Sequence, residues 1–295
     1  MLINNLTLLS GKRLMIKTPG PATRYQRRQL LRTLSALTGA GMLGSFPGLL
    51  AQAASADALP RLLEFQRLVA ANRILANENV VDAFGHVSVR HPDNPNQFVM
   101  SRSRSPALVE HEDLMVFDLE GNALDLRGRT AYGERMIHAA IYGTRPDVHS
   151  VVHHHAYSVL PFTITDEPLR PVVHAASVIG AEIPVWDIQE DYGDTDMLVR
   201  RIEQGRNLAA TLADNTCLLM RGHGAVVVGA DIQRAVLTAV YLQVNAEVLL
   251  QAKSLGEVTP LSEEEIRLSS ETQFSPLALP RVWEYFCQRA GVEAV

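Results

Sequence analysis

The sequence predicts a mixed α/β fold in which helices pack on a sheet that is not doubly wound. Hairpin patterns stand next to helical patterns, and no regular strand–helix–strand repeat runs through the chain. No Gly-x-Gly-x-x-Gly motif follows a strand pattern, and no phosphate-loop motif occurs. The chain has 295 residues and is 47% hydrophobic, so it can bury one sizeable core or at most two domains.

The first part of this fold is expected to be a helix followed by a hairpin. Residues 60–78 carry apolar side chains at helical spacing. The alternating stretches 86–90 and 97–101 predict two strands, joined by the turn sequence "HPDNPN". A further strand is expected within 113–124, which ends in a Gly-Asn turn.

The middle of the chain predicts five elements that alternate between helix and strand, over 133–143, 149–155, 156–164, 182–187 and 194–212. Asp194 is expected to cap the last of these helices. A strand, a tight turn and a second strand follow over 216–230. The clearest helix covers 231–253, with Asp231 as its cap.

The two ends of the chain are expected to lie outside the main domain, which we predict over 57–255. Residues 256–295 predict a polar linker and a last helix around Trp283 and Phe286. Residues 1–56 contain seven Lys or Arg and no acidic residue. The rest of the chain has 20 basic against 32 acidic residues, a charge of about −12, which argues against a nucleic-acid partner.

The basic front is typical of a twin-arginine export signal. Arg27 and Arg28 precede a mildly apolar run rich in Gly and Ala, and possible cleavage sites lie at 51–53 and 54–56. The alternative is an amphipathic or anchoring helix, but four Gly and one Pro within 33–54 disfavour a spanning helix. We therefore predict a periplasmic protein without a stable membrane anchor after signal removal.

The stretch "HSVVHHHAY" predicts a metal site. Side chains of a strand alternate between its faces, so His153 and His155 share one face and His154 points to the other. A catalytic metal site needs three protein ligands and an open position. His223, between the glycines of "RGHG", is the best third ligand because the turn lets its imidazole reach inward.

A carboxylate for proton transfer is expected near these ligands. Glu134 opens the helix before the histidine strand, although an acid in a first helical turn is common without catalysis. From spacing alone, a catalytic role of Glu134 and a plain role at the start of the helix are equally supported. Three other histidines are either partners of the ligands or ordinary structural residues, namely His138, His149 and His174.

These segments together resemble the class II aldolase/adducin-head family. The resemblance rests on "GERMIHAAIYGTRPDVHSVVHHHAYSV", "LLMRGHGAVVVG" and "GHVSVR", and covers about residues 60–255. It implies a three-layer α/β/α sandwich with a central, mainly antiparallel sheet, and a homotetramer with active sites at subunit interfaces. It also implies that His153, His155 and His223 bind the metal and that Glu134 is the acid/base.

The chain departs from the family's sugar-phosphate enzymes at the phosphate-binding positions. It has His86 in place of an Asn, Ser103 and Arg104 in place of Thr-Gly, and Tyr132 with a following Gly in place of a Ser pair. Arginine favours carboxylates, and histidine and tyrosine can flank an aromatic ring. We therefore expect these four side chains to bind a small carboxylate substrate, although a solvated basic loop would also explain Arg102 and Arg104.

The resulting hypothesis is a carbon–carbon lyase that depends on a divalent metal, Zn or Mn. "SRSRSPALVE" with "GHVSVR" resembles the branch typified by 3-hydroxy-2-methylpyridine-4,5-dicarboxylate decarboxylases. By this resemblance the enzyme decarboxylates a hydroxy-aromatic carboxylate through a metal-stabilised enolate or carbanion. Glu134 would protonate the carbanion and Arg104 would hold a second carboxylate. Two alternatives stay open: a retro-aldol lyase for an unphosphorylated hydroxy-acid or sugar, and a non-catalytic adducin-like interaction module.

Overall fold

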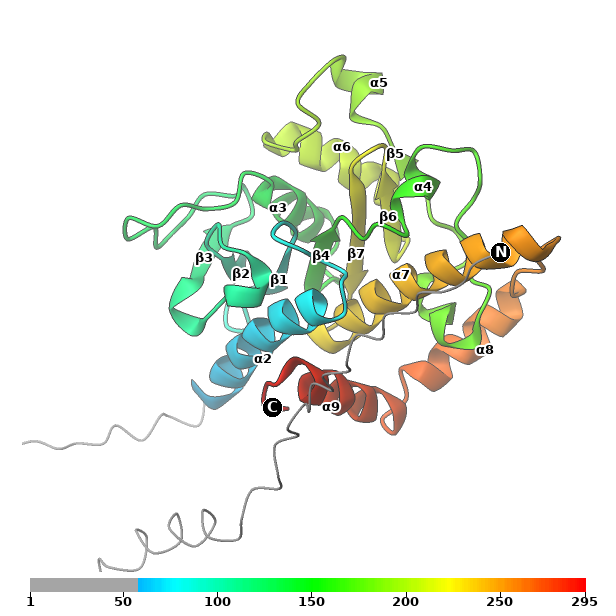
Figure 1. Cartoon of the computed structure of the whole chain (residues 1–295). Coiled ribbons are helices and arrows are strands. Elements are labelled where there is room, and N and C mark those ends of the chain that lie inside the picture. Colours follow the sequence, from blue (N-terminus) through cyan, green and yellow to red (C-terminus); the bar gives the residue numbers. More distant parts are fainter. Residues whose placement is uncertain (1–57) are drawn as a thin grey trace, which may run out of the picture. The chain divides into compact units, whose positions relative to one another are not determined.

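A mixed seven-stranded sheet organises the fold, with the strand order β3-β2-β1-β4-β7-β6-β5 (Figure 1). The strands are β1 (His86–Arg90), β2 (Gln97–Ser101), β3 (Leu114–Asp118), β4 (Ser150–His154), β5 (Val185–Trp186), β6 (Cys217–Met220) and β7 (Gly224–Gly229). All neighbouring strands are antiparallel except β5 and β6, which are parallel. The computed structural model describes residues 58–295, so the predicted export signal lies outside the described residues.

Helices cover both faces of this sheet. They are α2 (Ala58–Asn77), α3 (Arg135–Thr144), α4 (Leu160–Thr163), α5 (Ile188–Tyr192), α6 (Ile202–Leu212), α7 (Ile232–Leu255), α8 (Glu263–Gln273) and α9 (Ala278–Ala290). One apolar core joins the sheet to α2, α7 and α9, and a second joins the opposite face to α3 and α6 (Figure 1). The predicted α/β class is confirmed.

The alternation of β4 between these two cores decides where its histidines point. Val152 belongs to the core with α7, and Val151 belongs to the core with α3. His153 therefore faces the side of α3, and His154 faces the side of α7. In register, His153 lies opposite His86 of β1 and Val226 of β7, so it occupies the middle of the sheet.

The helix expected over 194–212 is wrong at its start. The chain instead forms the short helix α5, capped by Asp187, whose side chain accepts a hydrogen bond from the N–H of Gln189. A loop follows, and α6 begins only at Ile202. Gly193 and Met197 have positive φ angles of 66° and 64°, which a continuous right-handed helix cannot contain. Asp194 is thus not a helix cap.

The C-terminal region holds two helices, so the prediction of a polar linker before a single helix is wrong. Ser262 caps α8 in a capping box with Glu265. Trp283 and Phe286 of α9 are buried in the core shared with α2 and α7. By length and composition α7 is the one described helix that could cross a membrane, and 56% of its most apolar window is buried inside the protein.

Candidate metal centre

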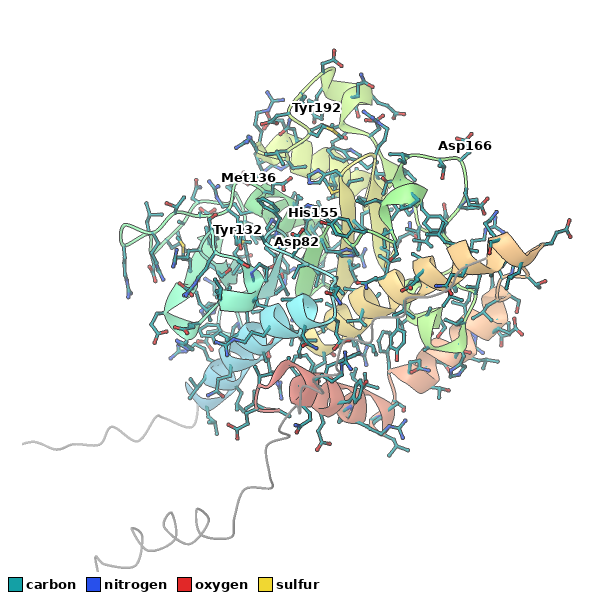
Figure 2. All side chains as sticks on the ribbon, in the orientation of Figure 1. Asp82, Tyr132, Met136, His155, Asp166 and Tyr192 are labelled. Carbon is teal, nitrogen blue, oxygen red and sulfur yellow. The ribbon has the colours of Figure 1, made fainter. Side chains whose placement is uncertain are left out.

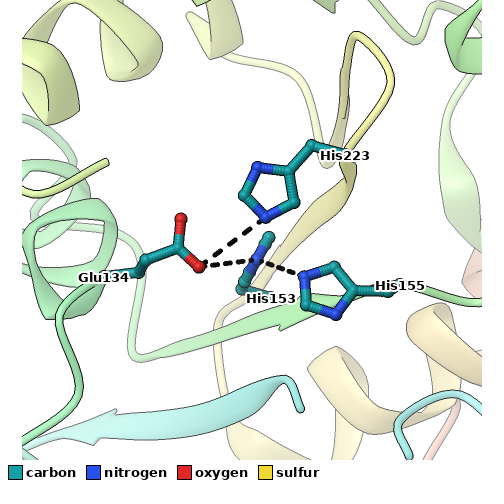
Figure 3. A group of neighbouring side chains, drawn as sticks. All are labelled: Glu134, His153, His155 and His223. Atoms are coloured by element: carbon teal, nitrogen blue, oxygen red, sulfur yellow. Dashed lines mark hydrogen bonds and ion pairs between the residues drawn. The ribbon is translucent and has the colours of Figure 1, made fainter. Parts of the chain in front are cut away.

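Four side chains that could hold a metal ion converge at the end of β4 (Figure 3). Glu134, His153, His155 and His223 each offer one ligand atom, and these atoms all lie within 4.8 Å of one another. Oε2 of Glu134 is 3.6 Å from Nε2 of His153 and 3.6 Å from Nε2 of His223. Nε2 of His155 is 3.0 Å from Nε2 of His153. The structure thus brings together the four residues that the sequence singled out.

The tight turn between β6 and β7 delivers His223 to the cluster. Gly222 has a φ angle of +61°, which glycine adopts without the cost that a side chain would add. At Gly224 a Cβ atom would come within 2.3 Å of the carbonyl oxygen of His154, so only glycine lets β7 approach β4 this closely. The two glycines of "RGHG" therefore serve the geometry of the turn.

The hydrogen bonds of the histidines fit a metal site. Nδ1 of His153 lies 3.1 Å from the carbonyl of Ala225, and Nδ1 of His223 lies 3.0 Å from the carbonyl of Met197. Because a carbonyl only accepts, each Nδ1 carries the proton and each Nε2 turns a lone pair toward the cluster. Lone pairs that converge in this way form the donor set of a candidate cation site, and imidazole nitrogens with a carboxylate suit a divalent ion.

The electrostatics of the cluster agree with that donor set. Burial lowers the pKa of His155 to about 3 and also lowers the pKa of His223, so both imidazoles are neutral, as metal ligands must be. Burial alone would raise the pKa of Glu134. The neighbouring imidazoles of His153 and His223 and the N–H of Val199 outweigh burial and hold the pKa below its ordinary value, so the carboxyl is ionised.

The cluster opens into a pocket of about 460 Å³, a size that suits a small molecule. His86 and Tyr132, two of the expected substrate-binding residues, line this pocket, with their ring centroids 4.7 Å apart. Tyr132 and the ligand His155, which also lines the pocket, are labelled in Figure 2. A planar molecule in this pocket would therefore meet aromatic rings beside the candidate metal ligands.

The other two expected substrate residues, Ser103 and Arg104, are not among the residues that line this pocket. Nη1 of Arg104 lies 2.6 Å from Oδ2 of Asp113, and Nε of Arg102 lies 2.6 Å from Oδ1 of the same carboxylate. The shared partner of the two arginines is the carboxylate of Asp113. The guanidinium of Arg104, which was expected to hold substrate, is therefore paired within the protein.

Two residues that the sequence did not single out, Phe84 and Arg200, line the pocket instead. Arg200 is 56% exposed along its side chain, and its Nε lies 2.9 Å from Oδ2 of Asp196. The expected helix over 194–212 hid this residue, because a helix interior gave no reason to place it at a site. Its position between a turn and the true start of α6 is the signal that could have found it.

Four further histidines that the sequence analysis weighed lie outside the cluster, two of them buried and two exposed. His138 is fully buried, and its Nε2 lies 2.7 Å from Nδ1 of His86. His154 is fully buried on the far side of β4, and its Nδ1 accepts a hydrogen bond from the N–H of Ala156. His149 and His174 are exposed and do not belong to the cluster.

Comparison with known proteins settles the family. Residues 66–250 match the family model of the class II aldolase and adducin N-terminal domain. The chain belongs to this class II aldolase/adducin family. Among curated relatives, the decarboxylase tropJ of Talaromyces stipitatus is 33% identical over 79% of this chain and 97% of its own length. The 3,4-dihydroxyphthalate decarboxylase of Arthrobacter keyseri is 28% identical over 65% of this chain and 79% of its own length.

Solved structures of the family share the fold. The L-fuculose 1-phosphate aldolase of Glaciozyma antarctica superposes with a TM-score of 0.65 at 23% identity, over 85% of this chain and 97% of its own. Curated relatives of this class II aldolase family member are named as decarboxylases and as aldolases, both of which cleave carbon–carbon bonds. The chain is accordingly an enzyme of the carbon–carbon lyase type.

Proposed function

We propose that this chain is a divalent-metal-dependent lyase that decarboxylates a hydroxy-aromatic mono- or dicarboxylate. One observation carries the proposal: three imidazoles and a carboxylate converge in a pocket lined by aromatic rings and an arginine. Relatives named as decarboxylases support the reaction type. The lack of a cup of small hydroxyl groups at the phosphate-binding positions supports a substrate without phosphate.

The residues that would hold the ion are His153, His155 and His223, with Glu134 beside them. Three imidazoles suit Zn, whereas the added carboxylate and an oxygen-rich substrate suit Mn. A divalent ion bound there supplies a Lewis acid that stabilises negative charge on an oxygen of the substrate.

Glu134 has the position and the charge for proton transfer. Its carboxylate is ionised and lines the pocket, so it can accept the proton of the substrate's ring hydroxyl. When the carbon–carbon bond to the carboxylate breaks, carbon dioxide leaves and the electron pair stays on the ring carbon. Glu134 then returns its proton to that carbon. The proton thus moves from the hydroxyl oxygen to the ring, and the product is released as a phenolate.

Arg200 is the best-placed group for a second carboxylate of the substrate. Arg200 lines the pocket, and the partner found for its guanidinium among residues 58–295 is Asp196, at Nε. We propose that Ser103 and Arg104 act through Tyr132. The Tyr132 hydroxyl donates to the carbonyl of Arg104, and the N–H of Ser103 donates to the carbonyl of Thr130 at 2.7 Å, which fixes the loop beside that ring.

The test is release of carbon dioxide by purified protein loaded with Zn or Mn. The probe is 3,4-dihydroxyphthalate, together with a panel of other 2-hydroxy-aromatic mono- and dicarboxylates. We expect metal-dependent release from at least one compound and none after chelation, with Glu134→Gln as the inactive control. The absence of release from the whole panel with either metal would refute decarboxylation.

A retro-aldol lyase for an unphosphorylated hydroxy-acid or sugar is the second candidate. It is favoured by relatives named L-fuculose phosphate aldolase, one of which, from Escherichia coli O6:H1, is 27% identical over 63% of this chain and 82% of its own length. Release of pyruvate or an aldehyde from a hydroxy-acid panel, without carbon dioxide, would support it. A non-catalytic adducin-like module requires that purified protein hold no stoichiometric divalent ion.

Assembly and location complete the proposal. We propose a homotetramer, a three-layer α/β/α arrangement and export to the periplasm.

The helices on both faces of the sheet support the layered arrangement. The tetramer predicts four times the chain mass of 32.4 kDa in light scattering. Cell fractionation of bacteria expressing the full chain, with and without an Arg27→Lys, Arg28→Lys change, tests the export.

A further inference from the structure

We propose that a buried hydrogen-bond chain from Tyr142 through Ser88 and His138 fixes the tautomer of His86. His86 then presents an Nε2–H donor to the pocket, with His138 as its positioning residue. This inference rests on the proposed function, because the donor is assigned to an anionic oxygen of a hydroxy-aromatic carboxylate. None of the four residues belongs to the cluster of candidate metal ligands.

The chain runs without a gap from the core to the pocket. The hydroxyl of Tyr142 lies 2.8 Å from Oγ of Ser88, which lies 2.6 Å from Nδ1 of His138. Nε2 of His138 lies 2.7 Å from Nδ1 of His86. All four residues are at most 3% exposed, and His86 lines the pocket. Short bonds in such a dry environment are strong, and their direction is costly to reverse.

The direction of the chain follows from its inner end. Within residues 58–295 the one hydrogen-bond partner found for the buried hydroxyl of Tyr142 is Oγ of Ser88, and a buried phenol proton without an acceptor is costly. The phenol proton therefore goes to Oγ of Ser88. Ser88 in turn has a single proton, and Nδ1 of His138 is the acceptor within reach. In the opposite direction the proton of Ser88 would point at Tyr142, and the phenol would lack an acceptor.

The two imidazoles transmit this direction to the pocket. Burial lowers the pKa of His138 to about 3, so this ring is neutral and carries one proton. Because its Nδ1 accepts from Ser88, that proton is on Nε2 and is donated to Nδ1 of His86. An Nδ1 that accepts leaves the proton of His86 on Nε2. Within residues 58–295 no protein partner is found for that Nε2, and it is not among the fully buried unpaired atoms.

A fixed donor at this position selects for substrate charge. The N–H of His86 stabilises a phenolate or carboxylate oxygen, whereas the other tautomer would turn a lone pair toward that oxygen and repel it. An asparagine side chain could rotate to offer either its carbonyl or its amide. His86, held by His138, offers only the donor. The pocket is therefore preorganised for an anionic oxygen beside the Tyr132 ring.

The direct test is the tautomer of His86, read from ¹⁵N NMR of metal-loaded protein labelled at histidine. A protonated ring nitrogen and a bare one give well-separated signals, and a His86→Phe variant assigns them. We expect protonated Nε2 and bare Nδ1 in the wild type, without any substrate. A proton on Nδ1 of His86 would overturn the inference, whatever the enzyme turns over.

The chain itself is tested by Ser88→Ala, with Ser150→Ala as the matched control. The hydroxyl of Ser150 is buried on the neighbouring strand and donates to the carbonyl of Ser88 at 2.9 Å, outside the chain. Ser88→Ala should mix the two tautomers of His86 and lower kcat/KM for 3,4-dihydroxyphthalate, or for whichever panel compound is decarboxylated, by about tenfold or more. Ser150→Ala should leave both unchanged.

Further outcomes keep the inference separate from the proposed function. If Ser88→Ala does not fold, Tyr142→Phe replaces it and should also weaken the tautomer preference. An unchanged tautomer and unchanged kcat/KM in the variant that folds would overturn the role of the chain. If no compound is decarboxylated, the proposed function fails, and the tautomers of the wild type and the variants alone decide the inference.

Discussion

Nε2 of His153 lies 3.6 Å from Oε2 of Glu134, although the whole of α3 separates the two residues along the chain. The lengths of the two elements explain this. The 10-residue helix α3 rises about 15 Å, and the 5-residue strand β4 returns over about 17 Å. The start of the helix and the end of the strand are therefore level with each other. The carboxylate lies beside the histidines because α3 and β4 run in opposite directions over nearly equal lengths.

Loss of a single imidazole should separate ligands from bystanders. We expect His153→Ala, His155→Ala and His223→Ala each to weaken Zn or Mn binding by more than about 100-fold. His154→Ala should keep its metal, because His154 faces the other core. It should still lose about 2–4 kcal/mol of stability from the cavity. Metal content by mass spectrometry, with calorimetric titration, checks this. Equal loss in all four variants would contradict the strand alternation.

Replacement of the carboxylate should separate binding from chemistry. In Glu134→Gln the amide oxygen can still accept from the N–H of Val199, which lies 3.1 Å from Oε1 of Glu134. We therefore expect a folded, metal-loaded protein whose kcat falls about 100- to 10,000-fold, because the proton shuttle is gone. Steady-state kinetics at matched metal content measure this. A variant that keeps its kcat would assign proton transfer to another group.

The histidines of the candidate metal site were predictable because local periodicity places them together. The period of two along β4 places His153 and His155 together, and the two glycines around His223 signal a turn. The distance of Glu134 from the histidines was not predictable from its own neighbourhood. It depends on which end of α3 lies beside the strand end, and that follows from tertiary packing.

The lining of the pocket was only half predictable, for a different reason. His86 and Tyr132 stand at positions that the family resemblance marks. Arg104 stands at such a position too. Its partner Asp113 lies directly before β3, and the spacing of the sequence does not predict this ion pair. Arg200 was hidden by a helix that the sequence pattern began too early. Long-range ion pairs and loops with positive φ angles leave no periodic signal.

Asp113 should stabilise the fold through its two arginines at neutral pH. Burial raises the pKa of Asp113, but the N–H of Glu110 and the guanidinium groups of Arg102 and Arg104 outweigh it, so the pKa lies below its ordinary value of 3.8. The stabilisation is present above pH 3.8 and is lost as pH falls through the lower folded value. Asp113→Asn should cost about 2 kcal/mol in urea unfolding at pH 7. Its effect should shrink as pH falls below 3.8. A cost that does not change with pH would rule out the carboxylate as its source.

His138 should make the metal-free protein sensitive to mild acid. Burial lowers its pKa from 6.5 to about 3, so below pH 6.5 the unfolded chain binds a proton that the folded chain does not. Stability is therefore lost as pH falls from 6.5 toward 3, at about 1.4 kcal/mol per pH unit for this group. His138 lies next to the nearly parallel ring of Phe98. A His138→Phe change should therefore remove the contribution of this group to the dependence of stability on pH. Urea unfolding between pH 6 and pH 4 measures the slope in both proteins. Identical slopes would show that His138 is already protonated in the fold.

Arg200 and Arg104 offer a matched pair of substitutions for the substrate carboxylate. Arg200 lines the pocket and pairs with Asp196 through Nε, whereas the guanidinium of Arg104 is paired with Asp113. Arg200→Gln should raise KM for a dicarboxylate about 10-fold or more, because a charge-assisted hydrogen bond is lost. Its KM for a monocarboxylate analogue should change less. Arg104→Gln should lower stability and leave KM nearly unchanged. The reverse pattern would mean that Arg104 exchanges Asp113 for substrate, and that the ion pair belongs to the empty pocket.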